Sequence, residues 1–108
     1  MEIQQLIIQH LDYLLLKKSE VKPLNVETLI EIGSYVAGGV LRGRFSLVKE
    51  VSQEEINGVF GVIGNFFKEH FPEDFTEKEF VIMRNKALEL MQETTFDSDL
   101  QSFMNTSR

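Results

Sequence analysis

The chain has 108 residues, enough for one domain with its own hydrophobic core. It contains no cysteine, which excludes disulfide bonds, zinc–thiolate sites and a cysteine nucleophile. The formal net charge of −6 has the wrong sign for a protein that binds nucleic-acid phosphates, and the 43% hydrophobic content is typical of a globular protein.

The first half of the chain predicts two helices. Apolar residues recur at steps of three and four from Ile3, which predicts a helix that ends at about Lys18, before the connector that contains Pro23. Asn25 is a suitable N-cap for a second helix that ends at about residue 41. Residues 42–51 are compatible with a loop or a short strand, and a loop is favoured because no second strand is predicted to pair with it.

The second half predicts two further long helices, each with a start signal. The segments 52–55 (Ser-Gln-Glu-Glu) and 76–79 (Thr-Glu-Lys-Glu) have the spacing of a capping box, in which a hydroxyl and a carboxylate satisfy backbone N–H groups of the first turn. The helices that they begin are expected to end at about Phe71, where Pro72 prevents continuation, and at about Gln92.

A short fifth helix is predicted near the C-terminus, with Asp97 or Ser98 as its N-cap and Leu100 on its apolar side. No internal repeat, low-complexity tract or linker interrupts the sequence. The predicted architecture is therefore all-α, a four-helix bundle-like domain with a short fifth C-terminal helix, in a single domain over residues 1–108.

The sequence gives no sign of a membrane or export signal. The longest charge-free apolar stretches, Ile32 to Leu41 and Ile56 to Phe67, are shorter than the ~20 residues of a membrane-spanning helix. The N-terminal apolar run carries Asp12, which is not typical of a signal or transit peptide. We expect a cytoplasmic protein.

Three glycines, Gly58, Gly61 and Gly64, follow one another at three-residue steps within the helix predicted after residue 52. Interior glycines at three positions destabilise a helix by roughly 3 kcal/mol relative to alanine, so a compensating close contact is expected. The small side of the second helix, which carries Gly33, would supply it within the monomer. A partner chain or second subunit in the same groove, or a kinked and flexible helix, are the alternatives.

The two histidines, His10 and His70, both fall on the apolar sides of their predicted helices. Together they could ligate haem iron or another metal, or act as a pH switch. Neither belongs to a Glu-x-x-His motif, and no carboxylate lies three or four residues after His10, so structural roles are predicted. No serine lies in a Gly-x-Ser-x-Gly elbow or near a histidine, and we expect neither an enzyme nor a cofactor.

A partner-binding patch is predicted where the third helix connects to the fourth. The hairpin of these helices can bury most phenylalanines, but Phe75 falls in the turn, and Val81 and Leu88 widen the apolar side of the fourth helix. Arg84 interrupts that side and could either lay its stem along the core or bind a partner's acidic group. The patch residues are Phe71, Phe75, Phe80, Val81, Arg84 and Leu88.

Charge is distributed unevenly along the chain. Residues 1–49 carry six basic and five acidic side chains, whereas residues 50–108 carry five basic and twelve acidic ones. The acidic half is either a solvated surface that keeps the protein soluble or a field that attracts a basic partner.

These features favour a non-enzymatic cytoplasmic protein-binding module, namely an inhibitor, immunity factor, adaptor or regulatory subunit that uses an apolar groove with an acidic rim. The wide apolar arcs also suggest a homodimer. One alternative is a helix-turn-helix DNA-binding regulator with Arg42, Arg44 and Lys49 near the phosphates. The second alternative is a carrier that binds a metal or haem through its histidines.

Overall fold

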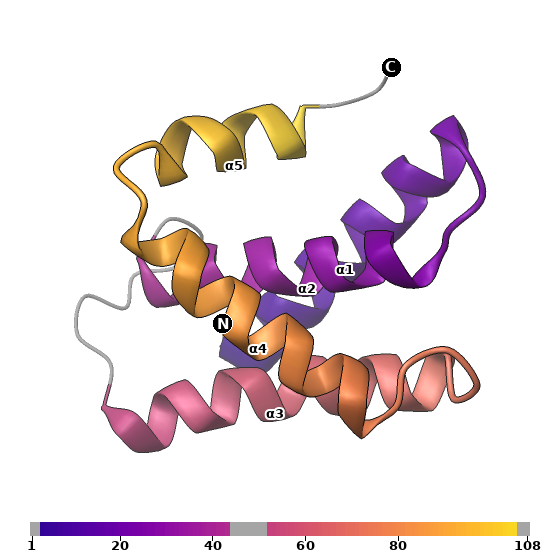
Figure 1. Cartoon of the computed structure of the whole chain (residues 1–108), viewed down its shortest axis with the longest axis horizontal. Coiled ribbons are helices and arrows are strands. Elements are labelled where there is room, and N and C mark those ends of the chain that lie inside the picture. The colour runs from indigo at the N-terminus through magenta and orange to yellow at the C-terminus, as the bar shows by residue number, and fades with distance from the viewer. Residues whose placement is uncertain (1–2, 44–51, 106–108) are drawn as a thin grey trace.

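The computed structural model describes residues 3–43 and 52–105, which form five helices and include no strand. The helices are α1 (Ile3–Val21), α2 (Val26–Leu41), α3 (Gln53–His70), α4 (Glu77–Gln92) and α5 (Phe96–Met104). Figure 1 shows their arrangement, which confirms the predicted all-α, bundle-like fold with a short fifth C-terminal helix.

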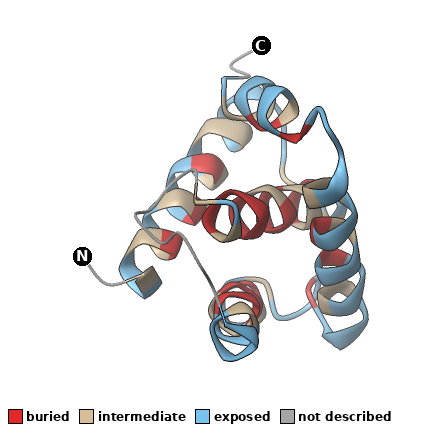
Figure 2. Cartoon of the chain, turned by 90° about the vertical axis from the view of Figure 1, so that its left-hand side faces the viewer, coloured by how far each residue is buried: buried red, intermediate tan, exposed pale blue. Residues whose placement is uncertain are grey.

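Helix α2 lies at the centre of the fold (Figure 2). Ten of its 16 residues are buried, and it packs against each of the other four helices. Its small residues make this close packing possible: Gly33 lies against Met83 of α4 and Phe67 of α3, and Gly38 lies against Phe96 of α5. A Cβ atom at Gly38 would lie only 2.8 Å from the Phe96 ring, so the lack of a side chain at this glycine leaves room for the side chain of the neighbouring helix.

The three predicted helix starts are confirmed. Asn25 caps α2 by accepting a hydrogen bond of 2.9 Å from the backbone N–H three residues later. In the first capping box, the Glu55 N–H donates to Ser52 Oγ at 3.2 Å and the Ser52 N–H donates to the Glu55 carboxylate. In the second, the Thr76 N–H donates to Glu79 at 3.0 Å, and this bonding holds the pKa of the Glu79 carboxyl below its usual value.

The end of the first helix differs from the prediction. Helix α1 continues to Val21, almost one turn beyond Lys18. Proline disfavours helix geometry chiefly at the single residue before it, so Pro23 permits the helix to continue almost to its own position.

The start of the fifth helix also differs. Thr95, not Asp97 or Ser98, is the N-cap of α5, which therefore begins at Phe96. The Phe96 side chain is buried, and this burial fixes the first turn earlier than local capping signals indicate. Of the predicted loop at residues 42–51, positions 44–51 lie outside the described residues.

Helix α5 packs against α1 and α2 through contacts around Phe103. The Lys18 amine of α1 donates to the Phe103 carbonyl oxygen at 2.8 Å and lies 3.8 Å from the centroid of its ring. Tyr35 of α2 stacks on the same ring at a centroid distance of 4.5 Å. Burial lowers the pKa of Lys18 and raises that of Tyr35. The Lys18 amine also compensates the partial negative charge of the carbonyl groups at the C-terminal end of α5, so Lys18 has a structural role.

Candidate functional site

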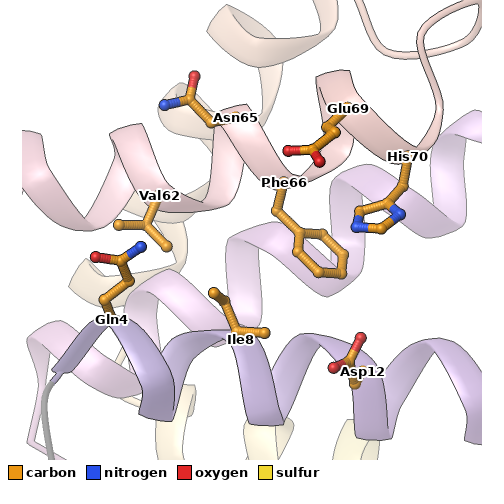
Figure 3. Close-up of a pocket in the computed structure, with 8 residues that line it drawn as sticks. All are labelled: Gln4, Ile8, Asp12, Val62, Asn65, Phe66, Glu69 and His70. Carbon is orange, nitrogen blue, oxygen red and sulfur yellow. The ribbon is translucent and has the colours of Figure 1, made fainter.

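Two adjoining hollows, with volumes of about 570 and 520 Å³, lie between α1 and α3. They share Gln4 and Val62 in their linings, and we name the two hollows together the α1–α3 groove. The larger half, drawn in Figure 3, is lined by Gln4, Ile8, Asp12, Val62, Asn65, Phe66, Glu69 and His70. The other half is completed by Ile3, Ile7, Ser52, Glu54, Glu55, Gly58 and Val59.

Helical spacing explains why these side chains meet. Ile8 and Asp12 are four residues apart on α1, and Val62, Phe66 and His70 follow at steps of four on α3. Residues four apart lie on the same side of a helix, so each helix presents one stripe to the groove. Figure 3 shows Phe66 and His70 pointing from α3 toward α1, where Ile8 and Asp12 point back at them.

The apolar part of the groove wall is incompletely covered. Ile8, Val62 and Phe66 are half-buried, whereas Ile7 and Val59, which lie deeper between the same helices, are buried. The half-buried side chains leave nonpolar area in contact with water. Covering such area is favourable by about 25 cal/mol per Å², so this surface is suited to binding an apolar partner.

The carboxylates are the charged groups among the aspartates, glutamates, lysines and arginines that line the described part of the groove. Asp12 and Glu69 lie in one half, and Glu54 and Glu55 lie in the other. No lysine or arginine is among the described residues that line the two halves. Within residues 3–43 and 52–105, Asp12 and Glu69 form no ion pair. The groove therefore has a negative field that a cationic ligand would complement.

The two histidines occupy different surroundings. His70 lines the groove, and its ring centroid lies 4.4 Å from that of Phe66. His10 is half-buried on α1, is not among the lining residues, and has a pKa lowered by burial. In the part of the chain that the structure describes, no group of three or more His, Cys, Asp or Glu side chains could hold a metal ion.

The structure corrects the predicted position of Phe75. Its side chain is only 1% exposed, and its ring centroid lies 5.0 Å from that of Phe67 in the core. The backbone turns inward there, because the Phe75 N–H donates to the Phe71 carbonyl oxygen at 2.8 Å. Phe71 and Phe80 are half-buried and pack against the core, so they contribute little to an exposed patch.

The other three patch residues lie on the outer side of α4. Val81 is 47% exposed and Leu88 is 37% exposed. Arg84 is exposed, and its guanidinium lies 6.0 Å from the centroid of the Phe60 ring, a weak cation–π contact. Figure 2 shows α4 and α1 on opposite sides of α2, so this surface is separate from the groove and remains a predicted partner surface.

The three glycines of α3 do not share one close contact. A Cβ at Gly64 would lie 2.5 Å from the Phe80 ring, whereas a Cβ at Gly58 or Gly61 would have nothing within 4 Å. The expected packing of all three against the small side of α2 is therefore wrong. Gly58 lines the α1–α3 groove and Gly61 has open space beside it, whereas the small side of α2 receives side chains that come mainly from α4 and α5.

Sequence reasoning missed the contribution of α1 to the groove. Ile8 and Val62 fall outside the main apolar stripes of their helices, and a polar residue lies three or four positions away from each, Asp12 for Ile8 and Asn65 for Val62. These surplus apolar residues were a usable signal. Their proximity depends on how α1 and α3 pack, which no local pattern contains.

Comparisons of the chain with protein-family models, curated proteins and solved structures gave no match. Among the described helices, none is long and apolar enough to cross a lipid bilayer. The proposals below therefore rest on the chemistry of the groove itself.

Proposed function

We propose that this protein is a non-enzymatic binding module that holds an amphipathic helix of a partner protein, rich in lysine or arginine, in the α1–α3 groove. The observation that carries this proposal is the combination of half-buried apolar side chains with the carboxylates of Asp12 and Glu69, which form no ion pair within residues 3–43 and 52–105. Inhibitors, immunity factors, adaptors and regulatory subunits in the cytoplasm all act through such non-covalent contacts.

The dimensions of the groove suit a helix. Its lining residues on α1 extend from Ile3 to Asp12, about 14 Å, and those on α3 extend from Glu54 to His70, a distance of about 24 Å at 1.5 Å per residue. A helix of about 16 residues has the same length, and helices commonly bind in grooves through apolar residues at spacings of three and four. Ile8, Val62 and Phe66 would contact the apolar side of that helix.

The DNA-binding alternative has less support. A recognition helix at α3 would present Glu54 and Glu69 to the phosphates, and its cation Lys68 is paired with Glu77 at 2.6 Å. Arg42 donates a hydrogen bond of 2.8 Å to the carbonyl oxygen of Met91, which accounts for its position at the end of α2. Arg44 and Lys49 lie outside the described residues.

The experiment measures binding of a fluorescent, helical Leu/Lys peptide of about 16 residues by fluorescence anisotropy. Two variants remove apolar contacts from the groove, Phe66→Ala and Val62→Ser. Each is expected to weaken binding at least about tenfold, because apolar anchors at the centre of an interface carry most of its energy. Val81→Ser is the matched control, since it makes the same valine-to-serine change at a more exposed position on α4, outside the groove.

Circular dichroism first establishes that each variant is folded. Equal affinity of all four proteins would show that the peptide is held by net charge alone and would overturn the proposal. Sedimentation of the unliganded protein provides a second test. A dimer that Phe66→Ala dissociates and Val81→Ser does not would identify a second copy of this chain as the occupant, against the proposal.

A further inference from the structure

We infer that the helix bound in the α1–α3 groove carries basic side chains at both ends of its apolar side and none in the middle. This inference rests on the proposed function and specifies the partner more narrowly. It follows from where the carboxylates lie along the groove, not from their number.

The groove has two acidic ends. Glu54 and Glu55 lie in the first turn of α3, beside Gln4 of α1. Glu69, in the last turn of α3, and Asp12 of α1 line the opposite end. Residue numbers increase in the same direction along the groove on both helices, so α1 and α3 run in the same direction, as Figure 3 shows for the larger half.

Among the described residues, those that line the segment between the two ends are uncharged. Gly58, Val62 and Phe66 supply it from α3, and Gln4 and Ile8 supply it from α1. A lysine placed there would lose part of its hydration against apolar side chains without meeting a carboxylate. A lysine at either end would keep its contact with water and gain an opposite charge.

The spacing of the carboxylates sets the spacing of the cations. Glu55 and Glu69 are fourteen residues apart on α3, which corresponds to about 21 Å along the helix axis. A helix lying along the groove covers this distance with about 14 residues, and residues about 11 or 14 apart also lie close to one side of a helix. The preferred partner therefore has lysines or arginines about 11 to 14 residues apart, with apolar residues between them.

Two peptide isomers test the inference. Both are helices of about 16 residues made of Leu, Ala, Gln and two lysines, with identical composition and net charge. One has its lysines near the two ends of the apolar side, and the other has them in the central turns. The first isomer is expected to bind about tenfold more tightly, because it gains two surface ion pairs and buries no cation.

Two charge variants locate the effect. Asp12→Asn and Glu54→Gln should each reduce the preference for the first isomer by about two- to threefold. Glu54 is chosen because Glu55 also forms the capping box of α3. Glu89→Gln removes an exposed carboxylate from α4 and is the matched control, expected to leave the preference unchanged.

The outcomes separate this inference from the proposed function. Equal binding of the two isomers, when Phe66→Ala weakens both, would overturn the charge arrangement and leave the groove as the binding site. Tighter binding of the centrally charged isomer would also overturn it. If Phe66→Ala changes the affinity of neither isomer, both the inference and the proposed function are refuted.

Discussion

Gly61 and Gly64 lie three residues apart in α3 and allow the same substitution to be made in opposite surroundings. A Cβ at Gly61 would have no atom within 4 Å, whereas one at Gly64 would lie 2.5 and 2.6 Å from two carbons of the Phe80 ring. We predict that Gly61→Ala stabilises the protein and that Gly64→Ala does not.

The expected gain at Gly61 follows from the backbone alone. Alanine is more favourable than glycine inside a helix by about 0.8–1.0 kcal/mol, chiefly because the unfolded chain has fewer conformations to lose. No contact opposes the new methyl group. The free energy of unfolding should therefore rise by about 0.5–1 kcal/mol, which corresponds to a melting temperature higher by about 2–6 °C.

The same gain at Gly64 is opposed by a clash. Two carbon atoms pack at about 3.5–4.0 Å, so the Phe80 ring would have to move by about 1 Å or more. Forcing an extra methyl group into a packed site costs about 1–3 kcal/mol. After the helix-propensity gain of about 1 kcal/mol, Gly64→Ala should change stability by between about 0 and −2 kcal/mol.

Urea denaturation followed by far-UV circular dichroism measures both values, with unchanged slopes as the condition for comparison. The double variant Gly64→Ala/Phe80→Leu tests the cause, because a smaller side chain at position 80 should recover part of the loss. Equal stabilisation by the two alanines would refute the close contact between Gly64 and Phe80. Destabilisation by Gly61→Ala would refute the open surroundings of Gly61.

Two further predictions concern His10 and Arg42. Burial lowers the pKa of His10 in the folded protein. As the pH falls, the unfolded chain therefore binds a proton at this histidine first, near the ordinary pKa of about 6.5. The stability that is present above that pH is lost as the pH falls toward the lower pKa of the folded protein. His10→Gln should therefore reduce the loss of stability on acidification, measured by urea denaturation at several pH values; a pH dependence equal to that of the wild type would contradict the assignment. Arg42 donates a hydrogen bond of 2.8 Å to Met91 in the last turn of α4, and its guanidinium lies 5.7 Å from the Phe96 ring centroid. Arg42→Ala should lower the free energy of unfolding by about 1 kcal/mol. Arg42→Lys should recover less than half of this loss, because an amine cannot reproduce the planar guanidinium contact. Full recovery of the free energy of unfolding by lysine would show that charge alone matters.

Helix starts were predictable because their determinants are local. Asn25, Ser52 and Thr76 each satisfy backbone groups within the first turn, so three or four residues of sequence contain the whole interaction. The start of α5 was not predicted correctly. It depends on the burial of Phe96, a long-range contact with α2 that no neighbouring residue indicates.

The location of the candidate groove was not predicted from the sequence. An apolar surface near carboxylates was expected around Phe75, yet the turn before α4 directs that side chain into the core. The groove combines Ile8 with Phe66, which are separated by more than half the chain. Periodicity assigns each residue to a side of its own helix and cannot show which sides face each other.

The central position of α2 explains how an apolar groove persists beside a complete core. Helices α1 and α3 each pack on α2 as well as on each other, so their deepest residues, such as Ile7 and Val59, are buried without any partner. Ile8, Val62 and Phe66 lie farther out and are only half-buried.

This difference decides which substitutions can test function. Phe75→Ala would remove a fully buried ring at a cost of about 3–5 kcal/mol, a large share of the about 5–15 kcal/mol that stabilises a typical domain. A loss of binding by that variant would report unfolding as readily as a lost contact. Phe66→Ala removes a ring that is already partly in water, so it should lose much less stability than Phe75→Ala while losing the partner. For each variant, the ratio of the loss in binding free energy to the loss in the free energy of unfolding distinguishes a residue of a binding surface from a residue of the core.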